Sequence, residues 1–550
     1  MIARRLPIFA LGLALVLAVA GCNGCRGRDV PQPQASPLAF LPKQPEGVVH
    51  VPDLEKVGRT VAQLEKTRLA ELAASAFGAS NPEQLVRPLV QQLGFDPRQP
   101  DGFAAAGIDG KRGLAVGPDE TGTQLLVVGV ADAGKFDAYA ASLAKRFGAA
   151  TRGTARWAPP AAEGAQPRPV EVQTFAGADG AVRVAFAQRD GYAVVASEAG
   201  AVEAVGRAIV RPWESSLAND AAYRKTAGKL GARDLYVWMP KGAQLQGRRG
   251  AQFESGLALG ASAGDGGVNV RVLVPRGPLE LAVIQPAGKV AGGDLVPLLP
   301  AEDFLALRLG GEPQALQPLL EAVMPRGLFV RLRRAGIDPG NEILAQLRPG
   351  VVVGLGLNPE IDLSGGLPAD AAVSRTNPFD FVTATVYAKV KDPARAAQVL
   401  EKLAAGAGQF QMQVASSDVD GAKVYKATYA AGEGMSWTLA GDTLIATGGK
   451  GAMEKARGRL ALADAPRFEV ADPSARKVFE SSASAAHLVV PRLTNALRAI
   501  PESAYGVGGF RIKAIVETWV GLLDEVKGMT ASFSVDDEGL VIDADLGLKK

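Results

Sequence analysis

The sequence contains few of the residues that most often carry chemistry in proteins. Among 550 residues there are two cysteines and two histidines. Cys22 and Cys25 lie together near the N-terminus, so the rest of the chain has no thiol. A disulfide within the folded body is therefore excluded, and so are thiolate and multi-histidine metal sites. The stability of the body must come from apolar burial and hydrogen bonds.

An excess of charge of one sign is also missing. Lys and Arg number 60, Asp and Glu number 57, and the formal net charge is +3. No broad basic field follows from such a balance, so nucleic acid is not a predicted partner. The composition, 47% hydrophobic and 21% charged, is typical of a globular protein.

The N-terminus has the pattern of an export signal. Arg4 and Arg5 precede an apolar run from Leu6 to Ala20, which at 15 residues is shorter than the roughly 20 that a membrane-spanning helix needs. Residues 1–21 are therefore predicted to be a signal peptide. No other part of this segment suggests a permanent membrane span.

The residues that follow carry a resemblance to a known class. Val19-Ala20-Gly21-Cys22 resembles the lipobox of bacterial lipoproteins. That resemblance implies diacylglycerol on the Cys22 sulfur, cleavage before Cys22, and an acyl group such as palmitate on the new amine. Asn23 stands where an aspartate would resemble the inner-membrane retention signal, so the resemblance favours the outer membrane. Two or three acyl chains would make such an anchor effectively permanent.

Residues 22–39 are predicted to be a lipidated flexible tether. The segment is rich in proline and polar residues and lacks hydrophobic periodicity. The expected location is the cell outer membrane, with the body on the periplasmic side or on the cell surface.

The rest of the chain repeats itself at a long and variable offset. Six short matches occur in the same order in both halves, and the first pairs Leu41-Pro42 with Leu299-Pro300. Insertions change the offset while the order is kept. We therefore predict a duplication, with copy 1 at 40–275, a connector at 276–297 and copy 2 at 298–550.

Short strands and amphipathic helices alternate within each copy. Val170–Ala176, Val182–Gln188 and Tyr192–Ser197 are separated by Gly- and Asp-containing turns, which favours antiparallel hairpins. Asp132 and Asp392 each precede an Ala-rich segment, where a carboxylate can cap a helix. The predicted fold class is α+β: two tandem related domains, each with a mainly antiparallel sheet covered by helices on one face. This layout resembles that of bacterial envelope proteins with duplicated α+β domains, a resemblance that carries no functional residue.

Copy 2 has an additional amphipathic helix, predicted near 510–527. Its apolar positions recur at helical spacing: Ile512, Ile515, Val516, Trp519, Leu522, Leu523 and Val526. Two interpretations stay open. The helix packs on its own sheet, or it covers a groove or meets a partner.

Candidate catalytic and metal-binding patterns are weak. His50 and His487 lie in apolar strand-like runs, where a hydrogen-bonded structural histidine is expected. Asp418-Val419-Asp420-Gly421 resembles the start of a calcium loop but lacks the later ligands, so a tight turn is predicted. No cofactor and no metal are expected.

Two serine patterns and one arginine cluster complete the search. Ser262 matches G-x-S-x-G but is predicted to lie in a strand rather than at a strand-to-helix turn. Ser142 and Lys145 match S-x-x-K on a predicted helix without the partner motifs of that enzyme class. A solvated helix face is the preferred explanation for the arginines at Arg326, Arg331, Arg333 and Arg334.

These patterns predict a lipoprotein, not an enzyme, that binds or scaffolds within the bacterial cell envelope. The membrane is its first partner, through lipid on Cys22, and an envelope protein, glycan or lipid is the second. The alternative is a carrier or sensor of hydrophobic ligands in the periplasm. A serine hydrolase using Ser262 is the third hypothesis.

Overall fold

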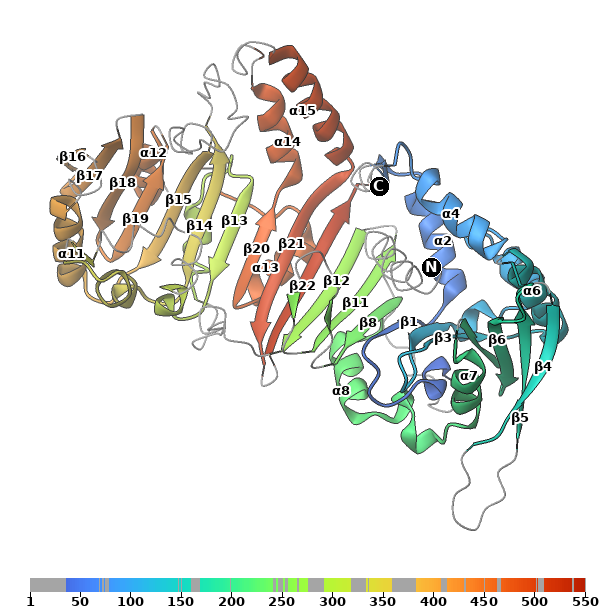
Figure 1. Ribbon diagram of the computed structural model, residues 1–550. Helices are drawn as coiled ribbons and strands as arrows, with labels where there is room; N and C mark the ends of the chain where they lie inside the picture. Colours follow the sequence, from blue (N-terminus) through green and yellow to red (C-terminus); the bar gives the residue numbers. More distant parts are fainter. Residues whose placement is uncertain are drawn as a thin grey trace. The chain divides into compact units, whose positions relative to one another are not determined.

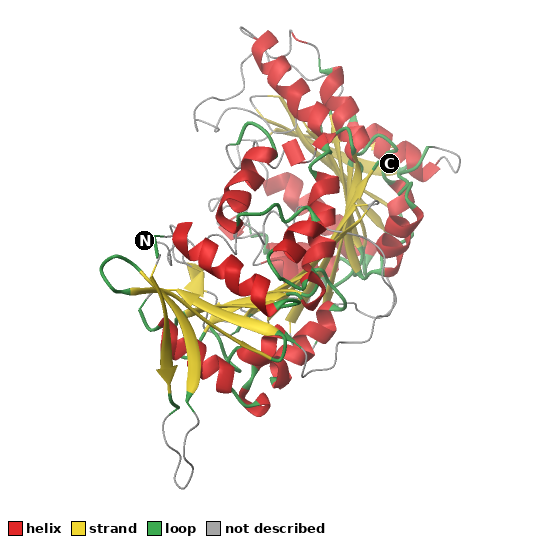
Figure 2. Ribbon diagram, turned by 90° about the vertical axis from the view of Figure 1, so that its right-hand side faces the viewer, coloured by secondary structure: helices red, strands yellow, loops and turns green. Residues whose placement is uncertain are grey.

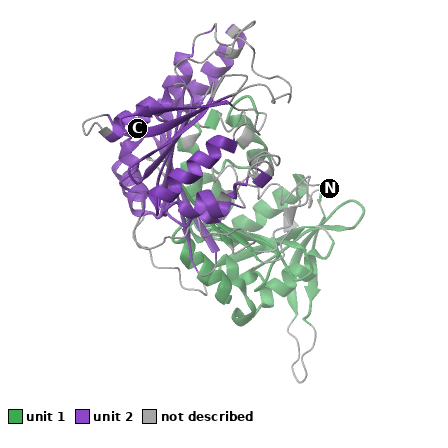
Figure 3. Ribbon diagram, turned by 90° about the vertical axis from the view of Figure 1, so that its left-hand side faces the viewer, with its two compact units in different colours: residues 1–277, 550 green, residues 278–549 purple. Residues whose placement is uncertain are grey.

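A computed structural model describes most of residues 36–549. Besides short gaps of one to three residues, the segments outside it are 75–78, 160–168, 246–250, 276–290, 318–332, 359–381, 407–412, 462–465 and 503–508. The described chain forms two compact units, residues 1–277 together with Lys550, and residues 278–549 (Figure 3). Cys22, the signal peptide and nearly all of the predicted tether lie outside the described residues. The predicted end of the tether at residue 39 is wrong, because Leu38 and Ala39 are buried in the core within the 3-10 turn Pro37–Phe40.

Unit 1 contains a sheet in which every pair of neighbouring strands is antiparallel. The paired strands follow the order β4-β5-β6-β7-β3-β2-β1-β8-β11-β12. Their bounds are β1 Val48–Val51, β2 Leu114–Pro118, β3 Gln124–Gly129, β4 Thr151–Trp157, β5 Val170–Ala176, β6 Val182–Arg189, β7 Tyr192–Ser197, β8 Leu235–Met239, β11 Leu257–Gly264 and β12 Gly267–Pro275. The two-residue strands β9 (Gln244–Leu245) and β10 (Ala251–Gln252) pair separately.

Helices connect these strands, and aspartate side chains cap several of them. The described helices are α2 Leu54–Leu64, α4 Glu83–Leu93, α5 Pro100–Ala105, α6 Ala133–Arg146, α7 Ala201–Val210 and α8 Ala221–Leu230, with short 3-10 turns such as η2 (Pro37–Phe40). Asp53 accepts a hydrogen bond from the Lys56 amide at 2.8 Å. Asp220 accepts one from the Tyr223 amide at 2.7 Å. Both satisfy an amide hydrogen that has no partner within its own helix.

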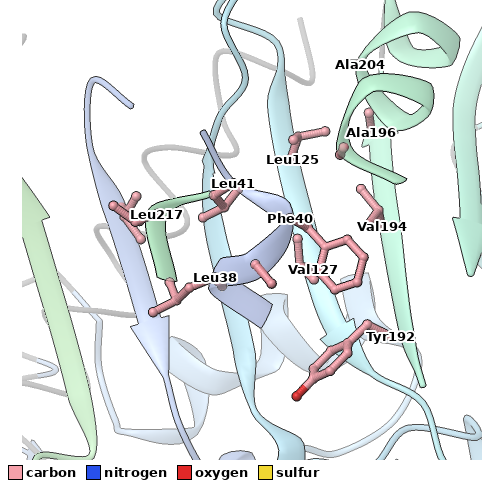
Figure 4. Packing of buried hydrophobic residues seen from close by; sticks show 14 of the residues in the cluster. Leu38, Phe40, Leu41, Leu125, Val127, Tyr192, Val194, Ala196, Ala204 and Leu217 are labelled. Carbon is pink, nitrogen blue, oxygen red and sulfur yellow. The ribbon is translucent and has the colours of Figure 1, made fainter. Parts of the chain in front are cut away.

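The sheet of unit 1 is buried on both faces, so the expectation that helices cover one face is wrong here. Val127 packs in one core cluster and its neighbour Val128 in another, as strand alternation requires. The first cluster lies among η2, α7 and α8, where Phe40 packs near Leu125 and Val194 (Figure 4). The second lies against α5 and α6. Helices on both sides bury more apolar area than one layer would.

The strands of unit 2 also pair antiparallel throughout. Their order is β16-β17-β18-β19-β15-β14-β13-β20-β21-β22. The bounds are β13 Leu305–Leu309, β14 Val351–Leu357, β15 Val382–Lys389, β16 Gln413–Val419, β17 Ala422–Tyr429, β18 Gly432–Ala440, β19 Thr443–Gly448, β20 Ser484–Leu488, β21 Val526–Val535 and β22 Gly539–Leu548.

The longer helices described in unit 2 all follow β15 in the chain (Figure 1). They are α11 Pro393–Gly406, α12 Ala452–Ala461, α13 Pro473–Ser481, α14 Val490–Ala499 and α15 Gly509–Leu523, preceded by the short turns η7 Val296–Leu298, η8 Pro313–Leu316, η9 Pro339–Ile343 and η10 Leu344–Gln346. Asp392 caps α11 through the amides of Ala394 and Arg395. Asp472 caps α13 through the amides of Ser474 and Ala475.

The two strand orders correspond strand for strand, from β4 and β16 at one end to β12 and β22 at the other. Backbone hydrogen bonds outside the strands also correspond. The Leu217 amide donates to the Leu41 carbonyl at 2.9 Å in unit 1, and the Phe468 amide donates to the Leu299 carbonyl at 3.1 Å in unit 2. Each unit is therefore a mixed α+β assembly built on an antiparallel sheet (Figure 2).

Candidate functional site

The feature of unit 2 that stands out chemically is the helical hairpin of α14 and α15. The two helices pack against each other, and α14 also contacts β14 and β21 (Figure 1). Lys513 of α15 donates to the carbonyls of Arg498 and Ile500, each at 2.6 Å. Arg498 forms an ion pair with Asp524. These contacts hold α15 by its polar residues on the side that faces α14.

The solvent-exposed side of α15 presents large apolar side chains. Phe510 and Ile515 are each 58% exposed and Trp519 is 46% exposed, whereas Val520 on the inner side is 1% exposed. These three are the most exposed of the large hydrophobic side chains that the structure describes. Clustered exposed apolar side chains mark interaction surfaces in soluble proteins. We call Phe510, Ile515 and Trp519 the α15 face.

The sequence located this helix but not its boundary or its outward side. The predicted end near residue 527 is wrong, because α15 ends at Leu523 and Val526 begins β21. Ile515 and Trp519, which one interpretation placed against the sheet, lie on the exposed side. Apolar periodicity shows that a helix has an apolar stripe. It does not show what covers that stripe.

A second feature of unit 2 is a buried carboxyl group that no sequence pattern indicated. Asp303 precedes β13 and is 2% exposed. Its carboxylate lies over Gly354 and Gly356 of β14, where any side chain would collide with it. Its Oδ2 is buried and has no hydrogen-bond partner among the described residues. Burial raises the pKa of Asp303 to about 7, and the neighbouring Glu302 adds to the rise.

Basic side chains lie near Asp303, but among the described residues none of them donates a hydrogen bond to its buried Oδ2. Arg459 and Lys455 of α12 instead pair with Glu302. Arg492 of α14 donates to the backbone carbonyl of Asp303 at 3.0 Å. The charges of these three residues oppose the rise of the Asp303 pKa but do not cancel it.

Both histidines have structural surroundings, as the sequence predicts. His50 lies in β1, stacks on Tyr236 and lies 3.5 Å from the Tyr223 hydroxyl. His487 lies in β20, with Nδ1 2.7 Å from the Thr530 hydroxyl. Burial lowers the pKa of each to about 4, so both rings are neutral at pH 7.

Ser262 lies within β11, paired with Asn269 of β12, as the sequence predicts. Its hydroxyl accepts a hydrogen bond from the Asp234 amide at 3.3 Å. In the described part of the chain no hydrogen bond joins Ser262 to a histidine. The strand-to-helix turn that exposes a serine nucleophile is replaced here by a β-hairpin.

The other candidate residues lie on separate elements, apart from Ser142 and Lys145, which share one helix. Ser142 and Lys145 are exposed on α6. The turn predicted at 418–421 is confirmed, because Asp420 and Gly421 have positive φ between β16 and β17. Arg333 and Arg334 are exposed, while Arg326 and Arg331 lie outside the described residues.

Within the described ranges, no group of three or more His, Cys, Asp or Glu side chains lies close enough to hold a metal ion. None of the helices described is both long and apolar enough to cross a membrane. No protein-family model, curated protein or solved structure matches this chain.

Proposed function

We propose that this protein is a lipoprotein of the bacterial outer membrane, anchored through lipid on Cys22, that acts as a non-enzymatic binding or scaffolding protein. The observation that carries the binding role is the α15 face, where Phe510, Ile515 and Trp519 lie exposed on a helix held in place from its other side. An ordered helix that exposes three large apolar side chains has the form of a docking element.

The body consists, in this proposal, of two tandem copies of one α+β domain. Matching strand orders and matching backbone hydrogen bonds support the duplication, together with the ordered sequence matches. The α14–α15 hairpin occupies the region where copy 1 has only the two-residue strands β9 and β10 among its described residues. Copy 2 thus carries the added element, and the binding role is assigned to it.

The proposal excludes catalysis for reasons specific to each candidate. Ser262 lies in a regular strand with its hydroxyl bonded to a backbone amide. The two histidines are held by Tyr223 and Thr530 in different units. Neither arrangement provides a nucleophile with an adjacent base.

Two measurements test the proposal. Mass spectrometry of the cell-made protein should find an acylated N-terminal Cys22, and an intact unmodified N-terminus would contradict the anchor.

A photoreactive amino acid at position 515 should capture one reproducible envelope component. The same group at Val419, another exposed apolar position of unit 2, should not capture it. Equal capture from both positions would contradict the binding role, and a lipid enclosed in the purified body would favour the carrier.

A further inference from the structure

We infer that the α15 face docks onto the lipid surface to which the protein is anchored, so that helix α15 forms a second membrane contact. This inference rests on the proposed lipid anchor for its biological setting. Its physical basis is the chemistry and the shape of the exposed side of α15.

The exposed side of α15 has the composition of an interfacial helix. Trp519 and Phe510 are aromatic, Ile515 is aliphatic, and Arg511 beside them is exposed. The Arg511 guanidinium lies 5.6 Å from the centre of the Phe510 ring. In the described part of the chain no ion pair joins Arg511 to a carboxylate. Aromatic side chains with an adjacent cation suit the boundary between acyl chains and phosphate groups.

The spacing of the three apolar side chains favours a lipid surface over a protein groove. Phe510 and Ile515 are five positions apart, which is about 140° around the helix, and Trp519 adds about 40° more. The three side chains of the α15 face are therefore spread over about half of the helix circumference, with the exposed Arg511 and Thr518 between Phe510 and Ile515. A protein groove usually contacts a narrower stripe of a helix, with side chains at positions i, i+3, i+4 and i+7. A fluid surface accommodates the wider arc.

The position of the predicted anchor makes a lipid surface the partner that is always close. Residues 22–35 separate Cys22 from the first described residue, Ser36, and a chain of that length spans at most about 50 Å. A tether of this length keeps the lipid surface at high effective concentration.

The inference is tested with the anchor removed. The test protein is the chain starting at residue 22 with Cys22→Ser, mixed with vesicles of phosphatidylethanolamine and phosphatidylglycerol and then sedimented. We expect it to bind the vesicles, and we expect Phe510→Ser, Ile515→Ser and Trp519→Ser together to lower the partition coefficient at least tenfold. The control combines Val419→Ser, Met435→Ser and Leu460→Ser, three exposed apolar positions elsewhere in unit 2, and should change it less than twofold.

Three results would overturn the inference. The first is that the Cys22→Ser protein does not bind vesicles. The second is that the control variant loses as much vesicle binding as the α15 variant. The third is that the protein forms a dimer without lipid and that the α15 substitutions dissociate this dimer. Circular dichroism must show that both triple variants remain folded. Because the assay uses no lipidated protein, it is independent of the anchor. Failure of the anchor would appear only as an unmodified Cys22 in the cell-made protein.

Discussion

The two units carry different side chains at matching positions of their sheets. In unit 1, one row of neighbours across the strands is apolar: Ala258, Trp238, Val48, Gly117, Leu125, Ala196 and Ala185. In unit 2, the row on the corresponding strands is small or polar: Thr530, His487, Ala306, Gly354, Thr385, Thr447 and Ser436. The backbone pattern is shared, and the chemistry at the centre of the sheet is not.

This difference has an energetic meaning. Trp238 and Leu125 belong to the main core of unit 1, and the larger apolar side chains there bury more apolar area than His487 and Thr385 do. At the matching positions unit 2 buries the hydroxyl groups of Thr385, Thr447 and Thr530, and it also buries the carboxyl group of Asp303. Buried polar groups cost free energy when they lack partners, as Asp303 Oδ2 does. We interpret unit 1 as the more firmly packed unit, and the function proposed above assigns binding to unit 2.

The sharpest test of this comparison replaces the matching Trp238 and His487 by alanine. Trp238 is buried and packs edge-on against Tyr223, so Trp238→Ala should lower the free energy of unfolding of unit 1 by about 3–5 kcal/mol. His487→Ala removes a smaller ring and one hydrogen bond, and should lower that of unit 2 by about 1–2 kcal/mol. Urea denaturation followed by circular dichroism measures both. Equal losses of unfolding free energy in the two variants would contradict the claim that unit 1 is the more firmly packed unit.

The second prediction concerns the pH dependence that Asp303 gives to unit 2. Because its folded-state pKa is raised to about 7, the folded state keeps the proton over a pH range in which the unfolded state releases it. Its stabilising contribution is therefore complete below pH 4 and is lost as the pH rises toward 7, by about 1.4 kcal/mol per pH unit at most. Asp303→Asn should remove this dependence and stabilise unit 2 by about 2 kcal/mol at pH 8.

Thermal unfolding of the wild type and of Asp303→Asn between pH 5 and pH 8 measures this effect. The matched control is Asp220→Asn, which alters a helix-capping carboxylate of unit 1. If the pH dependence of unfolding were the same with and without the Asp303 carboxyl group, the assignment of a raised pKa would be wrong.

The third prediction concerns a feature that the two units share, the aspartate caps of helices α8 and α13. Asp220 and Asp472 cap α8 and α13, which precede the matching strands β8 and β20. Asp220→Ala and Asp472→Ala should each lower the free energy of unfolding of their own unit by about 1 kcal/mol. Calorimetry of both variants checks this. A large loss in one unit alone would count against a shared local structure.

The smallest expected effect concerns the α15 face itself. Phe510→Ser, Ile515→Ser and Trp519→Ser should each change the free energy of unfolding by less than about 0.5 kcal/mol, because these side chains are largely exposed. Val520→Ser, on the inner side of the same helix, should cost about 1.5–3 kcal/mol. Denaturant midpoints of the four variants provide the measurement. A strongly destabilising Trp519→Ser would show that the face belongs to the core.

Local features of the fold were predictable from the sequence, and packing was not. The hairpin strands at 170–176, 182–189 and 192–197 and the caps at Asp132 and Asp392 follow from turn residues and periodicity. Burial of both sheet faces in unit 1 was missed, because α5 and α6 cover the second face and their contacts depend on tertiary structure. The alternation of apolar and polar residues along a strand does not show which helix from elsewhere in the chain packs against that strand.

The candidate site was predictable in part for a similar reason. Helical spacing identified the segment that became α15, but the side that meets solvent is decided by α14 and by the bonds of Lys513. Asp303 gave no signal in the sequence, because its burial depends on two glycines of β14 about 50 residues away. The lack of a hydrogen-bond partner for Asp303 Oδ2 becomes evident only in the folded structure, where β13 and β14 are paired.

Hydrogen exchange of α15 tests the central claim most directly. The amides of residues 510–523 are compared in the lipidated protein reconstituted in bilayers and in the Cys22→Ser protein in solution. Docking of the α15 face predicts at least fivefold slower exchange across α15 in the bilayer sample, with α7 of unit 1 unchanged. Identical exchange of α15 in the two samples would contradict the claim that this helix meets the membrane.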